Sequence, residues 1–331
     1  MKFRFLGNTG IQVSCLCLGS MTFGSETNKA PAKAIFNRCR DAGINFFDSA
    51  NVYSGGKSES ILGELISDCR DELIISTKFG DPVGSAPNLK GASRRNIIAA
   101  LEASLNRLQT DYIDFYFLHR FDVHTPLEET LRALDDLVSQ GKVRYIGVSN
   151  FAAWQIAKAL CVSALNGWIQ IHCIQPMYNL VKRQAEVEIL PLAQSENLGV
   201  MTYNPLGAGI LTGKYGKDHK SDSGRLTESD MYKKRYSQQW MYDAAVRFTE
   251  FASANGFHPV SLAVAWVAYH PAVTAPIIGA RNVEQLEASI KSMDIRMTQE
   301  LYDQVSQLTP TPPPATDRLE ERYKDKDSPD G

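Results

Sequence analysis

Short apolar runs alternate with longer amphipathic segments along most of the chain. The runs are LCLGSM, INFFDSA, ELIISTKF, YIDFYFLH, VRYIGVSN, CIQPMYN, GVMTYNP and APIIGA. The segments between them, including 33–41, 94–108, 127–140 and 188–197, have the apolar spacing of helices. Ser93 is suited to cap the second of these segments. Buried strands that alternate with helices are typical of a parallel sheet covered on both faces.

A parallel sheet of this kind can be open or closed into a barrel. The first run leads into GSMTFG rather than into the GxGxxG fingerprint of the doubly wound dinucleotide fold. Eight runs fit the closed alternative, so we predict an α/β fold, the (β/α)8 TIM barrel. The segment Phe3–Ser14 has a turn at Gly7–Gly10 between apolar stretches and predicts an N-terminal β-hairpin outside the repeat.

The spacing of the repeat locates one long insertion. Tyr203 and Gly279 are 76 residues apart, which is too far for one strand and helix, so we predict a long loop after strand 7. Its polar, glycine-rich part is 207–239, a binding loop, a lid or a disordered segment, and a helix is expected over 240–255. We predict one barrel domain over 1–308 and a flexible tail over 309–331, which is proline-rich and then charged.

Composition narrows the class of protein. The chain of 331 residues is 44% hydrophobic and has a formal net charge of -2. It therefore lacks the excess of positive charge that attracts nucleic acid. We expect no signal peptide and no membrane span. The six cysteines lack framework or metal spacing, which favours a reduced, cytoplasmic protein without a metal. A monomer is favoured, although the sequence leaves the oligomeric state open.

Polar side chains end nearly every predicted strand. They are Asp48 with Tyr53 in the following loop, Lys78, His119, Ser149 with Asn150, Gln175, Tyr203 with Asn204, and Gly279 to Arg281. Any one of them alone has a structural explanation, because strand ends meet solvent. Together they would meet at one barrel mouth, where the active sites of TIM barrels lie.

Four of these side chains suggest a chemistry. Asp48 would hold Lys78 charged, and the cation would lower the pKa of Tyr53 from its usual value of about 10. A phenol with a lowered pKa is a useful proton donor near neutral pH. His119 could orient a carbonyl oxygen by a hydrogen bond. The set holds no nucleophile for the reduction itself, so it needs hydride from outside, such as from a nicotinamide.

These residues resemble the aldo-keto reductase family. GINFFDSANVYSGGKSE is similar to the segment with the family's aspartate and tyrosine, ISTKFG to its lysine strand and FLHR to its histidine strand. The likeness continues through LGNTGIQVSCLCLGSMTFG, VRYIGVSN, IQPMYN, TYNPLGAGILTGKY and PIIGARNVEQLE, over about residues 1–295. It points to the subgroup of microbial and plant reductases and potassium-channel beta-subunit-like proteins.

The resemblance implies an NADPH (NADP+) site without a metal and the catalytic residues Asp48, Tyr53, Lys78 and His119. Cofactor contacts would come from Ser20, Met21 and Asp48. The carboxamide would be held by Ser149, Asn150 and Gln175, and Tyr203 would stack on the nicotinamide ring. Asn204, Leu206, Gly209 and Lys214 would line the pyrophosphate. Gly279, Arg281 and Gln285 would receive the adenosine 2′-phosphate, to which a guanidinium before a helix is suited.

Some features leave alternatives open. Ala288 and Ser289 stand where relatives often carry glutamate and asparagine against the adenine, so NADH could serve besides NADPH. Arg281 and Gln285 could be ordinary surface residues, and Arg225 is either a phosphate clamp or a solvated arginine.

The favoured function is the reduction of small aldehydes or ketones by NADPH, with no nucleic-acid or membrane partner. A second enzyme hypothesis makes Lys78 a Schiff-base nucleophile. A third hypothesis, from another class, is an NADPH-binding regulatory subunit with little turnover. The sequence does not identify the substrate.

Overall fold

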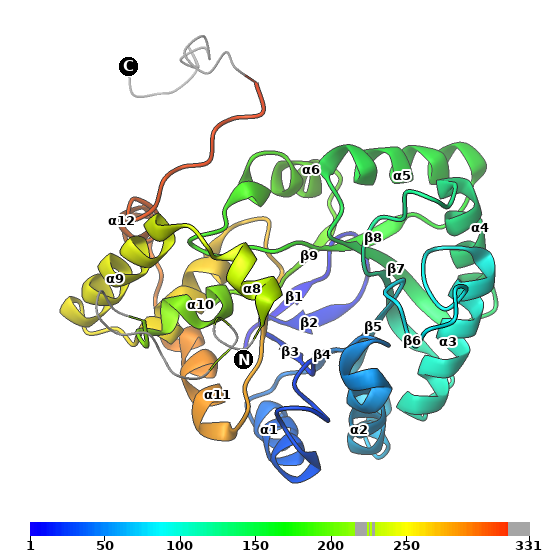
Figure 1. Ribbon diagram of the computed structural model, residues 1–331, viewed down its shortest axis with the longest axis horizontal. Coiled ribbons are helices and arrows are strands. Elements are labelled where there is room, and N and C mark those ends of the chain that lie inside the picture. Colours follow the sequence, from blue (N-terminus) through cyan, green and yellow to red (C-terminus); the bar gives the residue numbers. More distant parts are fainter. Residues whose placement is uncertain (216–223, 225, 227–228, 317–331) are drawn as a thin grey trace.

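A computed structural model gives the fold of residues 1–215, 224, 226 and 229–316. Within these residues eight parallel strands close into a barrel, which Figure 1 shows at the centre of the molecule. In order around the barrel they are β10 (Ala275–Ile278), β3 (Cys17–Gly19), β4 (Phe46–Asp48), β5 (Ile74–Phe79), β6 (Ile113–Leu118), β7 (Val143–Ser149), β8 (Ile171–Gln175) and β9 (Gly199–Thr202). The predicted (β/α)8 barrel is confirmed.

The predicted hairpin is also confirmed, because β1 (Phe3–Phe5) pairs antiparallel with β2 (Gln12–Ser14) outside the barrel. Its turn packs closely on the barrel. Gly7 has φ +58, and a Cβ there would lie 2.3 Å from the backbone nitrogen of Gly199, so only glycine allows this approach.

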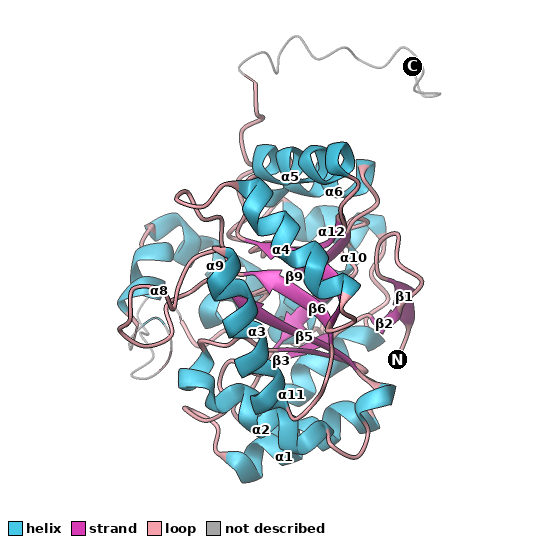
Figure 2. Ribbon diagram, turned by 90° about the vertical axis from the view of Figure 1, so that its right-hand side faces the viewer, coloured by secondary structure: helices cyan, strands magenta, loops and turns pink. Residues whose placement is uncertain are grey.

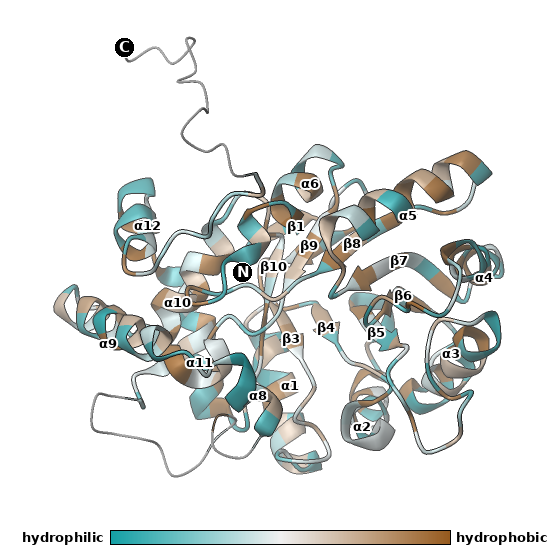
Figure 3. Cartoon of the chain, turned by 45° about the horizontal axis from the view of Figure 1, so that its top comes forward, coloured by the Kyte–Doolittle hydropathy of each residue, from teal (hydrophilic) through white to brown (hydrophobic). Residues whose placement is uncertain are grey.

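Helices surround the barrel, as Figure 2 shows. They are α1 (Lys29–Asp41), α2 (Lys57–Ile66), α3 (Arg94–Leu108), α4 (Leu127–Ser139), α5 (Ala153–Asn166), α6 (Ile189–Ser195), α9 (Gln239–Ala254), α10 (Pro259–Tyr269), α11 (Val283–Ile290) and α12 (Gln299–Ser306). Ser93 caps α3 as predicted, since its hydroxyl accepts a hydrogen bond from the Asn96 N–H at 3.3 Å. The bands of hydrophilic and hydrophobic residues on these helices in Figure 3 are typical of helices with one face against a core.

The barrel interior is packed with side chains. Phe115 and Phe117 of β6 point into a cluster with Phe46, Cys173 and Met201, whereas Tyr116 between them joins the layer of strands and helices. A Cβ at Gly147 would lie 2.3 Å from the ring of Phe117, so glycine in β7 makes room for this ring. A filled interior leaves the mouth at the carboxyl ends of the strands as the place for chemistry.

The long connection lies between β9 and β10, where the spacing predicted it. Its described parts include the 3-10 segment η4 (Gly207–Thr212), α8 (Asp230–Arg235), α9 and α10. Residues 216–223, 225, 227 and 228 lie outside the described residues, and with them Arg225. The helix α10 is almost wholly buried and was not singled out in the sequence, because it is apolar on every side.

The chain after α12 contacts the loop that follows β8 and the helix α9. Thr309 is buried and its hydroxyl lies 3.3 Å from the Arg183 guanidinium. Pro310, Pro312 and Pro313 line a hollow together with Leu180 and Trp240. The rest of the predicted tail, 317–331, lies outside the described residues. Among the described helices, none has the length and apolar character that crossing a membrane requires.

Candidate active site

The carboxyl ends of neighbouring strands bring the predicted catalytic side chains to one level of the barrel. Asp48 is the last residue of β4 and lies beside Ser76 of β5 in the register of the sheet. Lys78 lies opposite Phe117 of β6, and His119 follows that strand directly. Tyr53 begins the 3-10 segment η1 (Tyr53–Gly56) in the loop after β4.

Asp48 and Lys78 form a buried ion pair. The Lys78 Nζ lies 2.5 Å from Asp48 Oδ2 and 2.6 Å from the Ser49 carbonyl oxygen, and its side chain is 0% exposed. The other carboxylate oxygen accepts hydrogen bonds from Ser76 at 2.7 Å and Gln175 at 3.0 Å. Burial lowers the pKa of Lys78, but its attraction to the Asp48 carboxylate and its contact with Tyr53 outweigh burial and raise the pKa overall. Lys78 is therefore held as an ammonium ion, as the sequence suggested.

The phenol of Tyr53 lies next to this ammonium ion. Lys78 Nζ donates to the Tyr53 hydroxyl at 3.4 Å. Burial raises the pKa of Tyr53, and the Lys78 charge lowers it by less, so the net direction is upward. The prediction of a lowered Tyr53 pKa was therefore wrong, because removal of the phenol from water outweighs the nearby cation. At neutral pH Tyr53 keeps its proton.

His119 is neutral at physiological pH. Burial, followed by the charges of Lys78 and Arg120, lowers the pKa of His119 to about 3. Its Nδ1 approaches Asp81 Oδ2 to 3.1 Å without the alignment of a hydrogen bond, and it has no other hydrogen-bond partner among the described residues. Asp81 is itself paired with Arg120 at 2.5 Å, which weakens its pull on the imidazole. The ring of His119 faces Tyr53 edge-on, with centroids 6.0 Å apart.

The strand ends on the far side of the mouth carry amide and hydroxyl groups. Ser149 donates to the Gln175 carbonyl at 2.8 Å, and Tyr203 donates to Asn150 Oδ1 at 2.6 Å. The Asn150 amide donates in turn to the His119 carbonyl at 2.9 Å. Asn150 also has a positive φ of 57, a strained conformation of the kind found at functional sites. The structure therefore connects the predicted carboxamide residues in one network with the four predicted catalytic residues.

The predicted pyrophosphate residues follow β9. Asn204 has a positive φ of 63, its Oδ1 accepts from the Ala208 N–H at 2.7 Å, and its amide donates to the Tyr236 hydroxyl at 2.6 Å. Leu206 directly precedes η4, and a Cβ at Gly209 would lie 3.0 Å from Lys214. The sequence did not indicate Tyr236, which is buried and ties α8 to the strand end. No spacing or motif marks it.

The last predicted group lies where β3 and β10 run side by side. Ser20 donates to the Asp48 carbonyl at 3.0 Å, which connects the loop of Ser20 and Met21 to the end of β4. Gly279 follows β10, and the Arg281 N–H donates to Gln285 Oε1 at 3.2 Å at the start of α11. The Arg281 guanidinium forms an ion pair with Glu26, a residue that the sequence did not single out.

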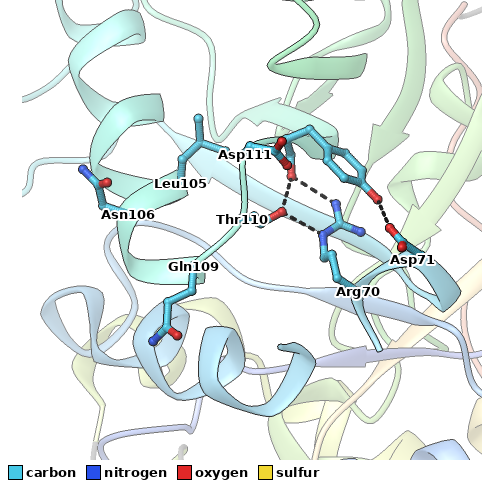
Figure 4. A pocket seen from close by; sticks show the side chains of 8 residues that line it. Arg70, Asp71, Leu105, Asn106, Gln109, Thr110 and Asp111 are labelled. Atoms are coloured by element: carbon cyan, nitrogen blue, oxygen red, sulfur yellow. Dashed lines mark hydrogen bonds between the residues drawn. The ribbon is translucent and has the colours of Figure 1, made fainter. Parts of the chain in front are cut away.

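An open hollow elsewhere on the surface, shown in Figure 4, is lined by Arg70 and Tyr112 among others. These residues precede β5 and β6, so the hollow lies at the amino ends of the strands, opposite the mouth. The Arg70 guanidinium donates to the Leu73 and Tyr112 carbonyls and to Asp114, all within 3.0 Å. These hydrogen bonds give Arg70 a structural role, and the hollow lies at the end of the barrel opposite the predicted catalytic residues.

No group of His, Cys, Asp or Glu side chains suited to a metal ion occurs among the residues that the structure describes.

Comparison with known proteins gives a consistent family. The family model described as "Aldo/keto reductase family" matches residues 15–310. The chain is 38% identical over 325 residues to the uncharacterized oxidoreductase YrpG of Bacillus subtilis, covering 94% of this chain and 97% of that protein. It is 36% identical to a probable voltage-gated potassium channel subunit beta of Oryza sativa and 35% identical to one of Arabidopsis thaliana, over 96% and 95% of this chain and 99% and 98% of theirs. The chain therefore belongs to the aldo/keto reductase family.

Proposed function

We propose that this protein is an NADPH-dependent oxidoreductase that reduces aldehydes and ketones to alcohols, with Tyr53 as the general acid. The observation that carries the proposal is the buried Lys78 and Asp48 pair, which places an ammonium ion 3.4 Å from a protonated phenol and next to a neutral His119. Family membership adds support, as does the oxidoreductase name of the Bacillus subtilis relative.

The residues around the mouth fit a nicotinamide dinucleotide. Ser149, Asn150 and Gln175 provide the hydrogen-bonding groups that a carboxamide requires, and Tyr203 offers a ring beside them.

At the adenine end, Arg281 and the start of α11 are suited to a phosphate. The pyrophosphate would lie along Asn204, Leu206, Gly209 and Lys214. Further cofactor contacts would come from the strand ends, at Ser20, Met21 and Gly279. Since Ala288 and Ser289 replace adenine contacts common in relatives, NADH is a second candidate cofactor.

The bound cofactor would supply the hydride that adds to the carbonyl carbon. The neutral imidazole of His119 can donate one N–H to the carbonyl oxygen and orient it. The Tyr53 hydroxyl then gives its proton to the same oxygen as the alcohol forms. Lys78 stabilises the phenolate that Tyr53 becomes, and Asp48 keeps Lys78 charged and in place.

Replacing Tyr53 by phenylalanine tests this assignment. Tyr53→Phe should lower the rate of aldehyde reduction by roughly 10²-fold or more, because the acid is lost. NADPH should still bind and quench the protein's fluorescence, because the substitution removes only the Tyr53 hydroxyl and keeps its aromatic ring. Tyr112→Phe is a matched control, because its hydroxyl lies at the other end of the barrel, 3.5 Å from Asp71. An unchanged rate in Tyr53→Phe would contradict the proposal.

A regulatory subunit with little turnover is the second candidate, favoured by the names of the rice and Arabidopsis relatives. Turnover on a panel of aldehydes, together with the molecular mass in solution, distinguishes it from an enzyme. A tetramer that binds NADPH tightly and reduces none of the aldehydes would favour this candidate.

A Schiff-base role for Lys78 loses support. Its pKa is raised and its ammonium group is paired with Asp48, whereas a nucleophilic lysine needs to lose its proton.

A further inference from the structure

Glu26 and Arg281 form an ion pair between two loops at the adenine end of the proposed cofactor site. Glu26 belongs to the loop between β3 and α1, and Arg281 belongs to the loop between β10 and α11. The two residues are 255 positions apart in sequence, but their strands are neighbours, since β10 pairs with β3. No motif discussed above includes Glu26.

The loop around Glu26 is held in a defined shape. Phe23 and Thr27 form an isolated β-bridge, and the Gly24 N–H donates to the Thr27 carbonyl at 2.9 Å with φ +79 at the glycine. The Thr22 hydroxyl donates to the Ala280 carbonyl at 3.3 Å, which joins this loop to the one that carries Arg281. The carboxylate therefore faces the guanidinium because both backbones are fixed.

Arg281 lies in a setting that suits an anion. It stands just before α11, whose first turn is capped by Asn282 through its side chain and the Gln285 N–H at 2.9 Å. A guanidinium at a helix N-terminus is suited to a phosphate. Here a carboxylate of the protein already faces that guanidinium, and both side chains remain about one third exposed, at 37% for Arg281 and 34% for Glu26. A ligand from solution can reach both.

We propose that Glu26 sets the preference of this protein between NADPH and NADH. The inference rests on the proposed dinucleotide site. A carboxylate can accept hydrogen bonds from the 2′-hydroxyl of an NADH ribose, as acidic residues do in other dinucleotide folds, whereas an arginine accommodates a 2′-phosphate. With both side by side, a 2′-phosphate must compete with Glu26 for Arg281 and is repelled by the carboxylate. Glu26 therefore favours NADH and opposes NADPH.

The test compares dissociation constants of NADP+ and NAD+, measured by quenching of intrinsic fluorescence, in the parent protein and in Glu26→Gln. Glutamine keeps the size of the side chain and removes its charge. We expect the ratio of the NAD+ to the NADP+ dissociation constant to rise by about 5-fold, a modest factor because the pair is partly exposed. The same shift should occur for 2′,5′-ADP against 5′-AMP, which lack the nicotinamide, and it should shrink at high salt.

Glu64→Gln is the matched control. It removes the same charge and also breaks a surface ion pair, with Lys29 of α1, but does not touch Arg281. An equal ratio in Glu26→Gln, Glu64→Gln and the parent would overturn the inference while leaving the dinucleotide site intact. Failure of the parent protein to bind either dinucleotide at millimolar concentration would instead overturn the proposed function, and this inference with it.

Discussion

The buried pair of Lys78 and Asp48 gives the most direct energetic prediction. Asp48→Asn keeps the shape of the side chain and removes its charge, so an ammonium ion remains at a position with 0% exposure. The polar neighbours of Lys78 would then be the new amide, the Ser49 carbonyl at 2.6 Å and the Tyr53 hydroxyl at 3.4 Å. None of these carries a charge that compensates the ammonium ion.

The size of the effect follows from burial. Removing one partner of a buried ion pair costs about 3–5 kcal/mol of folding stability. For a chain of this length that corresponds to a fall in Tm of roughly 4–7 °C. The cost has an upper limit. Without its charged partner the buried Lys78 has a lowered pKa, and it can release its proton instead of remaining charged. The unfolded chain then binds more protons than the folded protein below the ordinary lysine pKa, so the stability of the variant should increase as pH rises from 7 to 10.

Urea unfolding at pH 7 and pH 9 measures these effects. Asp48→Asn combined with Lys78→Met should be more stable than Asp48→Asn alone, because no unpaired charge remains. Glu102→Gln is a control that breaks the exposed pair with Lys142 and should cost less than about 1 kcal/mol. A cost below about 1 kcal/mol for Asp48→Asn, or no recovery in the double variant, would refute the argument from burial.

Two further predictions concern pH. The pKa of His119 in the folded protein, about 3, lies below its ordinary value, so stability is lost as pH falls below about 6.5, where only the unfolded chain binds the proton. His119→Gln should therefore lose about 2 kcal/mol less stability than the parent between pH 7 and 5 in urea unfolding; equal losses would contradict a neutral buried imidazole. The raised pKa of Tyr53 predicts a rate of carbonyl reduction that declines only above about pH 10, as the phenol loses its proton. A decline centred near pH 7 to 8 would instead support a lowered Tyr53 pKa.

The fold could be predicted because each apolar run ends at a polar or glycine residue and is followed by a helix pattern. The run YIDFYFLH illustrates what this pattern does not reveal. Phe115 and Phe117 fill the barrel interior, while Tyr116 packs outward and donates to the Ile97 carbonyl at 3.3 Å. A continuous apolar strand has no alternation by which to distinguish its two faces.

The candidate site could be located from the sequence for the same reason, since strand ends converge at one mouth. Its electrostatics could not be predicted. The direction of the Tyr53 pKa depends on how far burial outweighs the Lys78 charge, and burial is a property of packing. Glu26 and Tyr236 act on Arg281 and Asn204 through contacts distant in sequence, and no local pattern announces them.

One hydrogen bond connects the predicted catalytic residues with the residues proposed to hold the carboxamide. Gln175 ends β8 and Asp48 ends β4, four strands away in either direction around the barrel, so their 3.0 Å hydrogen bond spans the mouth. Asp48 thus uses one oxygen to hold Lys78 beside Tyr53 and the other to hold the residue proposed for the carboxamide. Because these bonds share one buried carboxylate, the position of the proposed nicotinamide and the protonation of the proposed acid would depend on the same side chain. A charged residue at the centre of the barrel is costly to bury, and this double use accounts for its place there.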